Sequence, residues 1–107
     1  MNFINRLKDQ MGDIHTKVEE ANHTTGAILL DVRTVEEYQR GHIPNSVSLP
    51  LDRIGEIDKI ASDEKTPLYV YCLSGGRSAQ ACNILKSAGY ENVQNIGGIS
   101  SWKGTIE

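Results

Sequence analysis

The chain has 107 residues, which is enough for one folded domain with a single hydrophobic core and leaves no room for a second. Its formal net charge of −3 argues against nucleic acid or an acidic membrane as a partner, because both attract basic proteins. The sequence has no apolar run of about 18 residues and no signal-peptide pattern, so we expect a cytoplasmic protein.

The first part of the chain is expected to be helical. Residues 1–12 predict a helical N-terminal extension, and residues 13–107 are expected to form the folded domain. Asp13 is a suitable N-cap for a helix that runs through Glu20, because its short side chain can accept a hydrogen bond from an unpaired backbone N–H group.

The next segments alternate between strand and helix patterns. Residues 27–32 form a continuous apolar run, which is typical of a central parallel strand. Thr34 then opens a capping-box pattern for a helix that ends at Arg40. A short strand is expected at 45–49, followed by one or two helical turns over 51–60.

The second half of the chain continues this alternation. Residues 67–72 predict a second central strand, residues 78–88 an amphipathic helix, and residues 93–96 a last short strand. Alternating strands and helices predict an α/β domain with a central, mainly parallel sheet of about four to five short strands flanked by helices on both faces.

The segment between the second central strand and its helix carries the clearest chemical signal. Cys72 ends the strand and lies beside the start of a helix, where unpaired backbone N–H groups collect and anions bind. Gly75 and Gly76 allow the N–H groups to converge, and Arg77 adds a positive charge. Such surroundings lower the pKa of a thiol and predict a cysteine nucleophile. The alternative is a buried strand cysteine followed by an ordinary turn.

Three other residues have both a functional and a structural interpretation. Asp31 and Arg33 lie at the carboxyl end of a central strand, at the sheet edge where ligands gather in open α/β sheets. Arg33 could attract an anionic donor, but we favour a buried ion pair with Asp31, since unpaired buried charges are unfavourable. His42 could be catalytic, but we favour a side chain that is hydrogen-bonded to the backbone.

The remaining polar candidates are interpreted in the same way. Cys82 lies on the core face of its helix and is expected to be a small buried hydrophobe, with a resolving thiol as the alternative. The Ser78 hydroxyl either caps the helix or donates to a bound sulfur group. Trp102 is expected to pack against the sheet. The two cysteines and three scattered histidines show no metal-ligand spacing, so we expect neither a metal nor another cofactor.

Six motifs, in family order, resemble the rhodanese-like sulfurtransferases over residues 14–106. They are Leu30-Asp-Val-Arg33, Glu37-Tyr-Gln-Arg-Gly-His-Ile-Pro44, Val47-Ser-Leu-Pro50, Tyr71-Cys-Leu-Ser-Gly-Gly-Arg-Ser78, Ala88-Gly-Tyr-Glu-Asn-Val93 and Gly97-Gly-Ile-Ser-Ser-Trp-Lys103. Where members of this family often have Gly-Ala after His-Ile-Pro, the chain has Asn45-Ser46. Asparagine tolerates the left-handed backbone, so we expect the turn to survive. The resemblance implies a rhodanese-like fold for residues 13–107.

The resemblance also implies a single-domain sulfurtransferase of the thiosulfate sulfurtransferase (rhodanese) type. Cys72 would take the outer sulfur of thiosulfate, or of a similar small anionic donor, as a persulfide. It would then pass this sulfur to cyanide or to a thiol, which could belong to a protein. The substrate-binding residues would be those of the loop after the nucleophile, together with one arginine at the neighbouring strand end: Leu73, Ser74, Gly75, Gly76, Arg77 and Arg33.

Three other functions remain as alternatives. A persulfide carrier that passes sulfur between proteins would use the same loop, whereas noncatalytic regulatory modules usually lack the cysteine. Cysteine-dependent phosphatases and arsenate reductases of this fold family carry one more loop residue, which makes room for a tetrahedral oxyanion, and a phosphatase also needs an acid for the leaving group. The six-residue loop from Cys72 to Arg77 therefore favours sulfur transfer.

Overall fold

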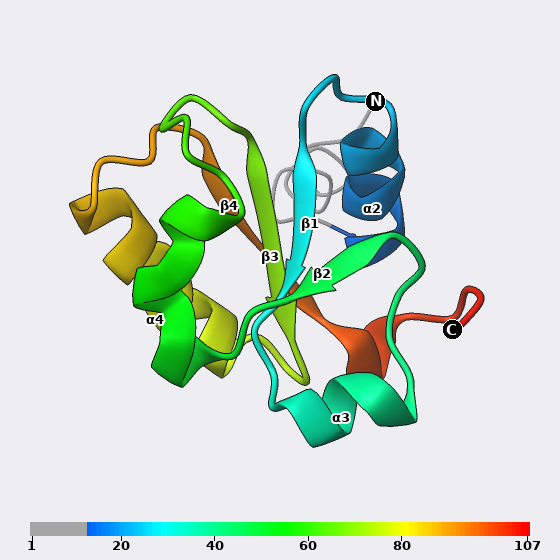
Figure 1. Cartoon of the computed structure of the whole chain (residues 1–107). Helices are drawn as coiled ribbons and strands as arrows, with labels where there is room; N and C mark the ends of the chain where they lie inside the picture. Colours follow the sequence, from blue (N-terminus) through cyan, green and yellow to red (C-terminus); the bar gives the residue numbers. More distant parts are fainter. Residues whose placement is uncertain (1–12) are drawn as a thin grey trace, which may run out of the picture.

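The computed structural model describes residues 13–107, so the helical extension predicted at 1–12 lies outside the described residues. Within the described range, four parallel strands form one sheet in the order β2-β1-β3-β4 (Figure 1). The strands are β1 (Ile28–Asp31), β2 (Ser46–Ser48), β3 (Leu68–Cys72) and β4 (Val93–Gly98). The predicted α/β fold with a central parallel sheet is confirmed.

Helices cover both faces of the sheet, as predicted (Figure 1). The helical elements are α2 (Ile14–Asn22), α3 (Val35–Arg40), η1 (Leu51–Lys59), α4 (Gly76–Ser87) and the short η2 (Ile99–Ser101), where η denotes a 3-10 helix. Successive strand residues point to opposite faces, so Leu29 and Tyr69 pack against α2 while Leu30 and Val70 pack against η1 and α4. None of the described helices is long and apolar enough to cross a membrane.

The predicted starts of α2 and α3 are confirmed by their caps. The Asp13 side chain accepts a hydrogen bond from the His15 backbone N–H at 2.9 Å, at the start of α2. At the start of α3, the Thr34 hydroxyl accepts from the Glu37 N–H, and the Glu37 carboxylate accepts from the Thr34 N–H at 3.1 Å. This reciprocal capping box satisfies two N–H groups that have no partner within the helix.

Two smaller sequence predictions are also confirmed. Asn45 has a φ of 70°, so an asparagine does occupy the left-handed turn before β2. Trp102 is partly buried against the apolar cluster on the α2 face of the sheet, and its ring stacks on His15 with a centroid distance of 4.8 Å. This stacking connects the C-terminal segment to the first described helix.

Three element boundaries differ from the prediction by two residues. The helix predicted to run through Glu20 continues to Asn22, and the other two boundaries lie next to Cys72. The helix predicted to start at Ser78 starts at Gly76, because Gly75 takes a φ of 112° and acts as the N-cap. The strand predicted to end at Ile96 continues through Gly98, which pairs with Cys72 after a bulge in the β3–β4 ladder. The N-capping role considered for Ser78 is therefore wrong.

Candidate active site

Cys72 lies at the carboxyl end of β3, and its side chain is enclosed by the loop that follows. Its Sγ accepts hydrogen bonds from the backbone N–H groups of Gly75, at 3.0 Å, and Ser78, at 3.3 Å. The Ser78 hydroxyl also lies 3.3 Å from the sulfur. The left-handed conformation of Gly75 turns the chain so that these donors converge, which a residue with a side chain would adopt only under strain. Cys72 itself is 1% exposed.

These donors lower the pKa of Cys72. Burial is the largest single effect and raises the pKa of the thiol, because it disfavours the charged form. The hydrogen bonds from the Ser78 side chain and from the backbone of Ser78, Gly75 and Ser74 act in the opposite direction and together outweigh burial. The thiolate is the nucleophilic form of cysteine, so the loop favours the reactive state of Cys72.

The loop residues other than Gly75 differ in exposure. Leu73, Ser74 and Gly76 are exposed and form the outer edge of the loop, while Arg77 is partly buried. Two hollows flank this edge. One, of about 290 Å³, lies beside Ser74 and the end of β4, and the other, of about 260 Å³, lies beside Arg77 and the start of η1.

Arg77 lies in the first turn of α4, and its charge is matched by α3. Its guanidinium forms two hydrogen bonds with the Glu37 carboxylate, at 2.7 and 3.1 Å. The hydrogen bonds from Arg77, together with those from Thr34, lower the pKa of Glu37 to about 2, although partial burial of the carboxylate opposes the shift. The capping-box pattern that begins at Thr34 includes Glu37, whereas the ion pair with Arg77 depends on how α3 and α4 are placed in space.

Asp31 and Arg33 form the buried ion pair that we favoured. Arg33 is 5% exposed, and its Nη2 lies 2.7 Å from the Asp31 carboxylate. The same nitrogen also donates to the Gly41 carbonyl oxygen at 2.8 Å, at the end of α3. With its guanidinium occupied in this way, Arg33 connects β1 to α3, and the contacts give no support to the substrate-binding role considered for it.

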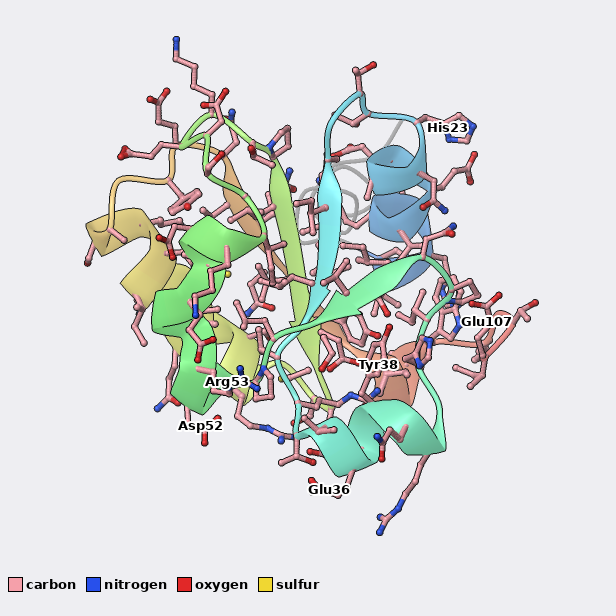
Figure 2. The ribbon with its side chains drawn as sticks, viewed as in Figure 1. His23, Glu36, Tyr38, Asp52, Arg53 and Glu107 are labelled. Atoms are coloured by element: carbon pink, nitrogen blue, oxygen red, sulfur yellow. The ribbon has the colours of Figure 1, made fainter. Side chains whose placement is uncertain are left out.

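His42 also makes the backbone contact that we favoured. Its Nδ1 lies 2.9 Å from the Tyr38 carbonyl oxygen, and its ring stacks on the Tyr38 ring with a centroid distance of 3.8 Å. Tyr38 lies on α3 and donates its hydroxyl hydrogen to the Ser46 carbonyl oxygen at 2.7 Å (Figure 2). His42 therefore belongs to a structural cluster that holds α3 against β2.

Cys82 is buried within the core on α4, as predicted, and is 4% exposed. Burial raises its pKa to about 11, which disfavours the thiolate that a resolving cysteine needs. Both cysteines are free thiols. Among the residues that the structure describes, no group of three or more histidine, cysteine or acidic side chains could hold a metal ion.

Two residues of β4 hold the loop in place and were missed from the sequence. The Asn95 amide donates to the Gly75 carbonyl oxygen at 3.1 Å, and its Oδ1 accepts from the Ser78 hydroxyl at 2.7 Å. Gly98 lies directly against the loop, because a Cβ atom there would overlap the Leu73 carbonyl group. In the sequence, the one sign of these two contacts is that the polar residue Asn95 stands shortly before the Gly97-Gly98 pair.

Comparisons with known proteins agree with this fold. The family described as Rhodanese-like domain matches residues 14–105. Among solved structures, "rhodanese with anions from E. coli" is 32% identical with a TM-score of 0.71, and the match covers 76% of this chain and 96% of that one.

Two curated relatives are similar over most of the domain. Thiosulfate sulfurtransferase PspE of Escherichia coli is 38% identical over 71 residues, which are 65% of this chain and 68% of the relative. Putative sulfur carrier protein YrkF of Bacillus subtilis is 40% identical over 82 residues, 74% of this chain and 43% of the relative. The chain thus spans less than half the length of the second relative. Its match to a third curated relative covers 25% of the length of that protein. The match over residues 14–105 shows that the chain belongs to the rhodanese-like domain family.

Proposed function

We propose that the chain is a sulfurtransferase that carries a transferable sulfur atom on Cys72. The observation that supports this most is the set of hydrogen bonds to the Cys72 sulfur from Gly75 and Ser78, in a loop of six residues. Similarity to a thiosulfate sulfurtransferase and to a putative sulfur carrier supports the same chemistry.

The proposed reaction has two displacement steps. The Cys72 thiolate attacks the outer sulfur of thiosulfate, a new S–S bond forms, and sulfite leaves with the electron pair of the broken bond. Cyanide, or a thiolate acceptor, then attacks the outer sulfur of the Cys72 persulfide and releases the Cys72 thiolate. The covalent intermediate divides one difficult transfer into two easier steps, which is the general advantage of nucleophilic catalysis.

The loop would stabilise the negative charge at both stages. The N–H groups that contact the Cys72 sulfur are preorganised by the turn at Gly75, so they need no rearrangement when the charge develops. The persulfide adds one sulfur atom to Cys72, and we propose that this atom lies toward the outer edge of the loop, where Leu73, Ser74 and Gly76 are exposed. We propose these exposed residues and Arg77 as the substrate-binding part of the site.

A persulfide carrier is the second candidate function, in which the acceptor is a protein thiol. The observation that favours it is Leu73, which is 46% exposed although it lies directly next to the nucleophile. An exposed apolar side chain there suits contact with a protein surface better than contact with a small anion.

The first experiment measures thiocyanate formation from thiosulfate and cyanide. We expect the wild-type protein and Cys82→Ala to produce thiocyanate, because burial raises the pKa of the Cys82 thiol to about 11 and leaves almost no thiolate at neutral pH. Cys72→Ala should give only the uncatalysed rate. Equal rates from Cys72→Ala and the wild type would rule out Cys72 as the nucleophile.

A mass measurement separates the two candidate functions. The protein is treated with a small-molecule persulfide, and its intact mass is compared with that of Cys72→Ala treated in the same way. A gain of one sulfur atom by the wild type together with negligible thiocyanate turnover would favour the carrier. Rapid turnover of thiosulfate would favour the enzyme.

A further inference from the structure

Three groups compete for the single hydrogen atom of the Ser78 hydroxyl. The Ser78 Oγ lies 2.7 Å from Asn95 Oδ1, 3.0 Å from the Gly75 carbonyl oxygen and 3.3 Å from the Cys72 Sγ. A hydroxyl has one hydrogen to donate and two lone pairs that accept. The acceptor that Ser78 selects therefore determines whether Ser78 acts as a donor or an acceptor toward the Cys72 sulfur.

Two backbone groups fix the orientation of the Asn95 amide. Its Nδ2 donates to the Gly75 carbonyl oxygen at 3.1 Å, and its Oδ1 accepts from the Gly97 N–H at 3.0 Å. A flipped amide would place NH₂ against the Gly97 N–H and oxygen against the Gly75 oxygen, which are two repulsive pairs. Oδ1 therefore faces Ser78 and can only accept its hydrogen. The amide also occupies the Gly75 oxygen, which makes that oxygen a weaker competitor.

We propose that Asn95 is a positioning residue that draws the hydroxyl hydrogen of Ser78 away from the Cys72 sulfur and so limits how readily Cys72 loses its proton. While Cys72 is a thiol, Ser78 donates to Asn95 and can accept the S–H hydrogen. When Cys72 ionises, the hydroxyl must rotate toward the sulfur, and Asn95 Oδ1 loses this donor. Asn95 thus favours the thiol, while the loop N–H groups favour the thiolate.

This arrangement has a consequence for the proposed sulfur transfer, on which the inference rests. A thiolate becomes less nucleophilic as the pKa of its thiol falls, so the best attacking thiol has a pKa near the ambient pH. Through Ser78, Asn95 would keep Cys72 from becoming too acidic to be a strong nucleophile. The proton moves between Cys72 and solvent, and no redox change is involved.

Charged and titratable groups from several elements also act on Cys72 or lie close to it. They are Arg77 on α4 with its partner Glu37 on α3, Asp31 at the end of β1 with its partner Arg33, and Cys82 on α4. All of them are retained in the Asn95 and Ser78 variants, so a difference in the Cys72 pKa between these variants comes from Asn95 and Ser78.

The test is a double-mutant cycle of Asn95→Ala and Ser78→Ala, in which the pH dependence of iodoacetamide alkylation gives the Cys72 pKa. We expect Asn95→Ala to lower this pKa by about half a unit, which is less than one full neutral hydrogen bond, because the Gly75 carbonyl oxygen also loses its amide donor and competes more strongly for the Ser78 hydrogen. In the Ser78→Ala background, Asn95→Ala should not lower it. No fall, a rise, or an equal fall in both backgrounds would overturn the proposal.

Asn92→Ala is a matched control, because its amide contacts the Lys65 carbonyl oxygen at the other end of β4, and it should leave the Cys72 pKa unchanged. If Asn95→Ala does not fold, Asn95→Leu provides the test, because leucine has a similar volume and no polar side-chain atom. It should lower the Cys72 pKa with Ser78 present and leave it unchanged in the Ser78→Ala background. An equal fall in both backgrounds, or no fall with Ser78 present, would overturn the proposal. Alkylation needs no sulfur donor, so this result is separate from the outcome of the thiocyanate assay.

Discussion

The acidity of Cys72 comes from hydrogen bonds within its own loop. Burial raises the pKa of both cysteines, which are 1% and 4% exposed. For Cys72 the donors from Ser78, Gly75 and Ser74 outweigh burial, whereas Cys82 has burial as its main effect and reaches a pKa of about 11. The two thiols therefore differ because of the donors around each sulfur and not because of their exposure.

This difference predicts selective alkylation of the folded protein at pH 7. With a pKa of about 11, Cys82 would be ionised in roughly one molecule in ten thousand at this pH. We expect iodoacetamide to label Cys72 and leave Cys82 unmodified, as read by mass mapping of the peptides. Unfolding in denaturant should expose both thiols, which provides the positive control. Comparable labelling of Cys82 in the folded protein would contradict the assignment.

The candidate nucleophile could be predicted from the sequence, but the residues that hold its loop in place could not. Cys72 was identifiable because the strand end, the glycine pair and the helix start are adjacent in the sequence. Asn95 is distant from the loop in sequence, and its contacts with Gly75 and Ser78 exist because β4 pairs with β3. A hydrogen bond across a parallel sheet depends on strand order and register, which the local pattern does not contain.

Among the elements, α3 and α4 are connected through one carboxylate. Glu37 accepts the hydrogen bonds of the Thr34 capping box and pairs with Arg77 at the start of α4. The capping box could be predicted because it is local, but the ion pair could not. Glu37 thus links the stability of α3 to the placement of the first turn of α4, which carries Ser78 and its N–H donor.

The variant Glu37→Gln tests this link, because glutamine keeps the capping box and removes the charge. The pKa of Glu37 is lowered from 4.5 to about 2, so its ionised form stabilises the fold above pH 4.5, and this contribution is lost as the pH falls toward 2. We expect the wild type to be more stable by about 1 kcal/mol at neutral pH. Denaturant unfolding at a series of pH values should show the difference shrinking below pH 4.5.

A difference in stability that is independent of pH would contradict this role of the Glu37 charge. The control is Glu36→Gln on the same turn of α3, where the side chain is exposed and no ion pair is recorded within the described range. Its effect should be smaller. Figure 2 shows Glu36 at the side of the molecule where Asp52 and Arg53 of η1 also lie, and these three residues line one shallow hollow.

The contact between β4 and the loop predicts a severe effect of Gly98→Ala. The added Cβ would overlap the Leu73 carbonyl group, which is backbone and cannot rotate away as a side chain could. We expect a loss of about 1–3 kcal/mol in the free energy of unfolding, together with slower alkylation of Cys72, because the loop must shift. Gly55→Ala on η1 is the matched control, since nothing lies within 4 Å of its added Cβ. If the two variants lose the same stability and are alkylated at the same rate, the loop does not depend on the close contact between Gly98 and Leu73.

At the scale of the whole molecule, the fold could be predicted better than the ends of its elements. Hydrophobic runs and alternation identify the strands and helices, because burial on both faces of a parallel sheet leaves a strong pattern. The start of α4 and the end of β4 could not be predicted, since both depend on the packing of Gly98 against the loop and the left-handed turn at Gly75. Two of the three mispredicted boundaries thus lie at the candidate active site, and the third is the end of α2.

The charge distribution predicts how the proposed reaction with thiosulfate responds to salt. The net charge is −3, and Arg33 and Arg77, the two arginines near the loop, pair with Asp31 and Glu37. Electrostatic steering of an anion requires a positive field and weakens as salt screens it. We therefore expect kcat/KM for thiosulfate to stay within about twofold, or to rise slightly, as ionic strength increases from low to physiological values.

The variant Glu37→Gln makes this prediction sharper, because it leaves the Arg77 guanidinium without its paired charge. At low salt we expect its kcat/KM for thiosulfate to exceed the wild-type value and then to fall toward it as salt is added, since the free cation attracts the dianion. Glu36→Gln changes the net charge by the same amount away from Arg77 and should show a weaker effect. If kcat/KM of the wild type instead falls steeply as salt is added, the field at the loop is positive in spite of the Arg77–Glu37 ion pair. The pairing of Arg77 with Glu37 would then not neutralise the charge that attracts thiosulfate.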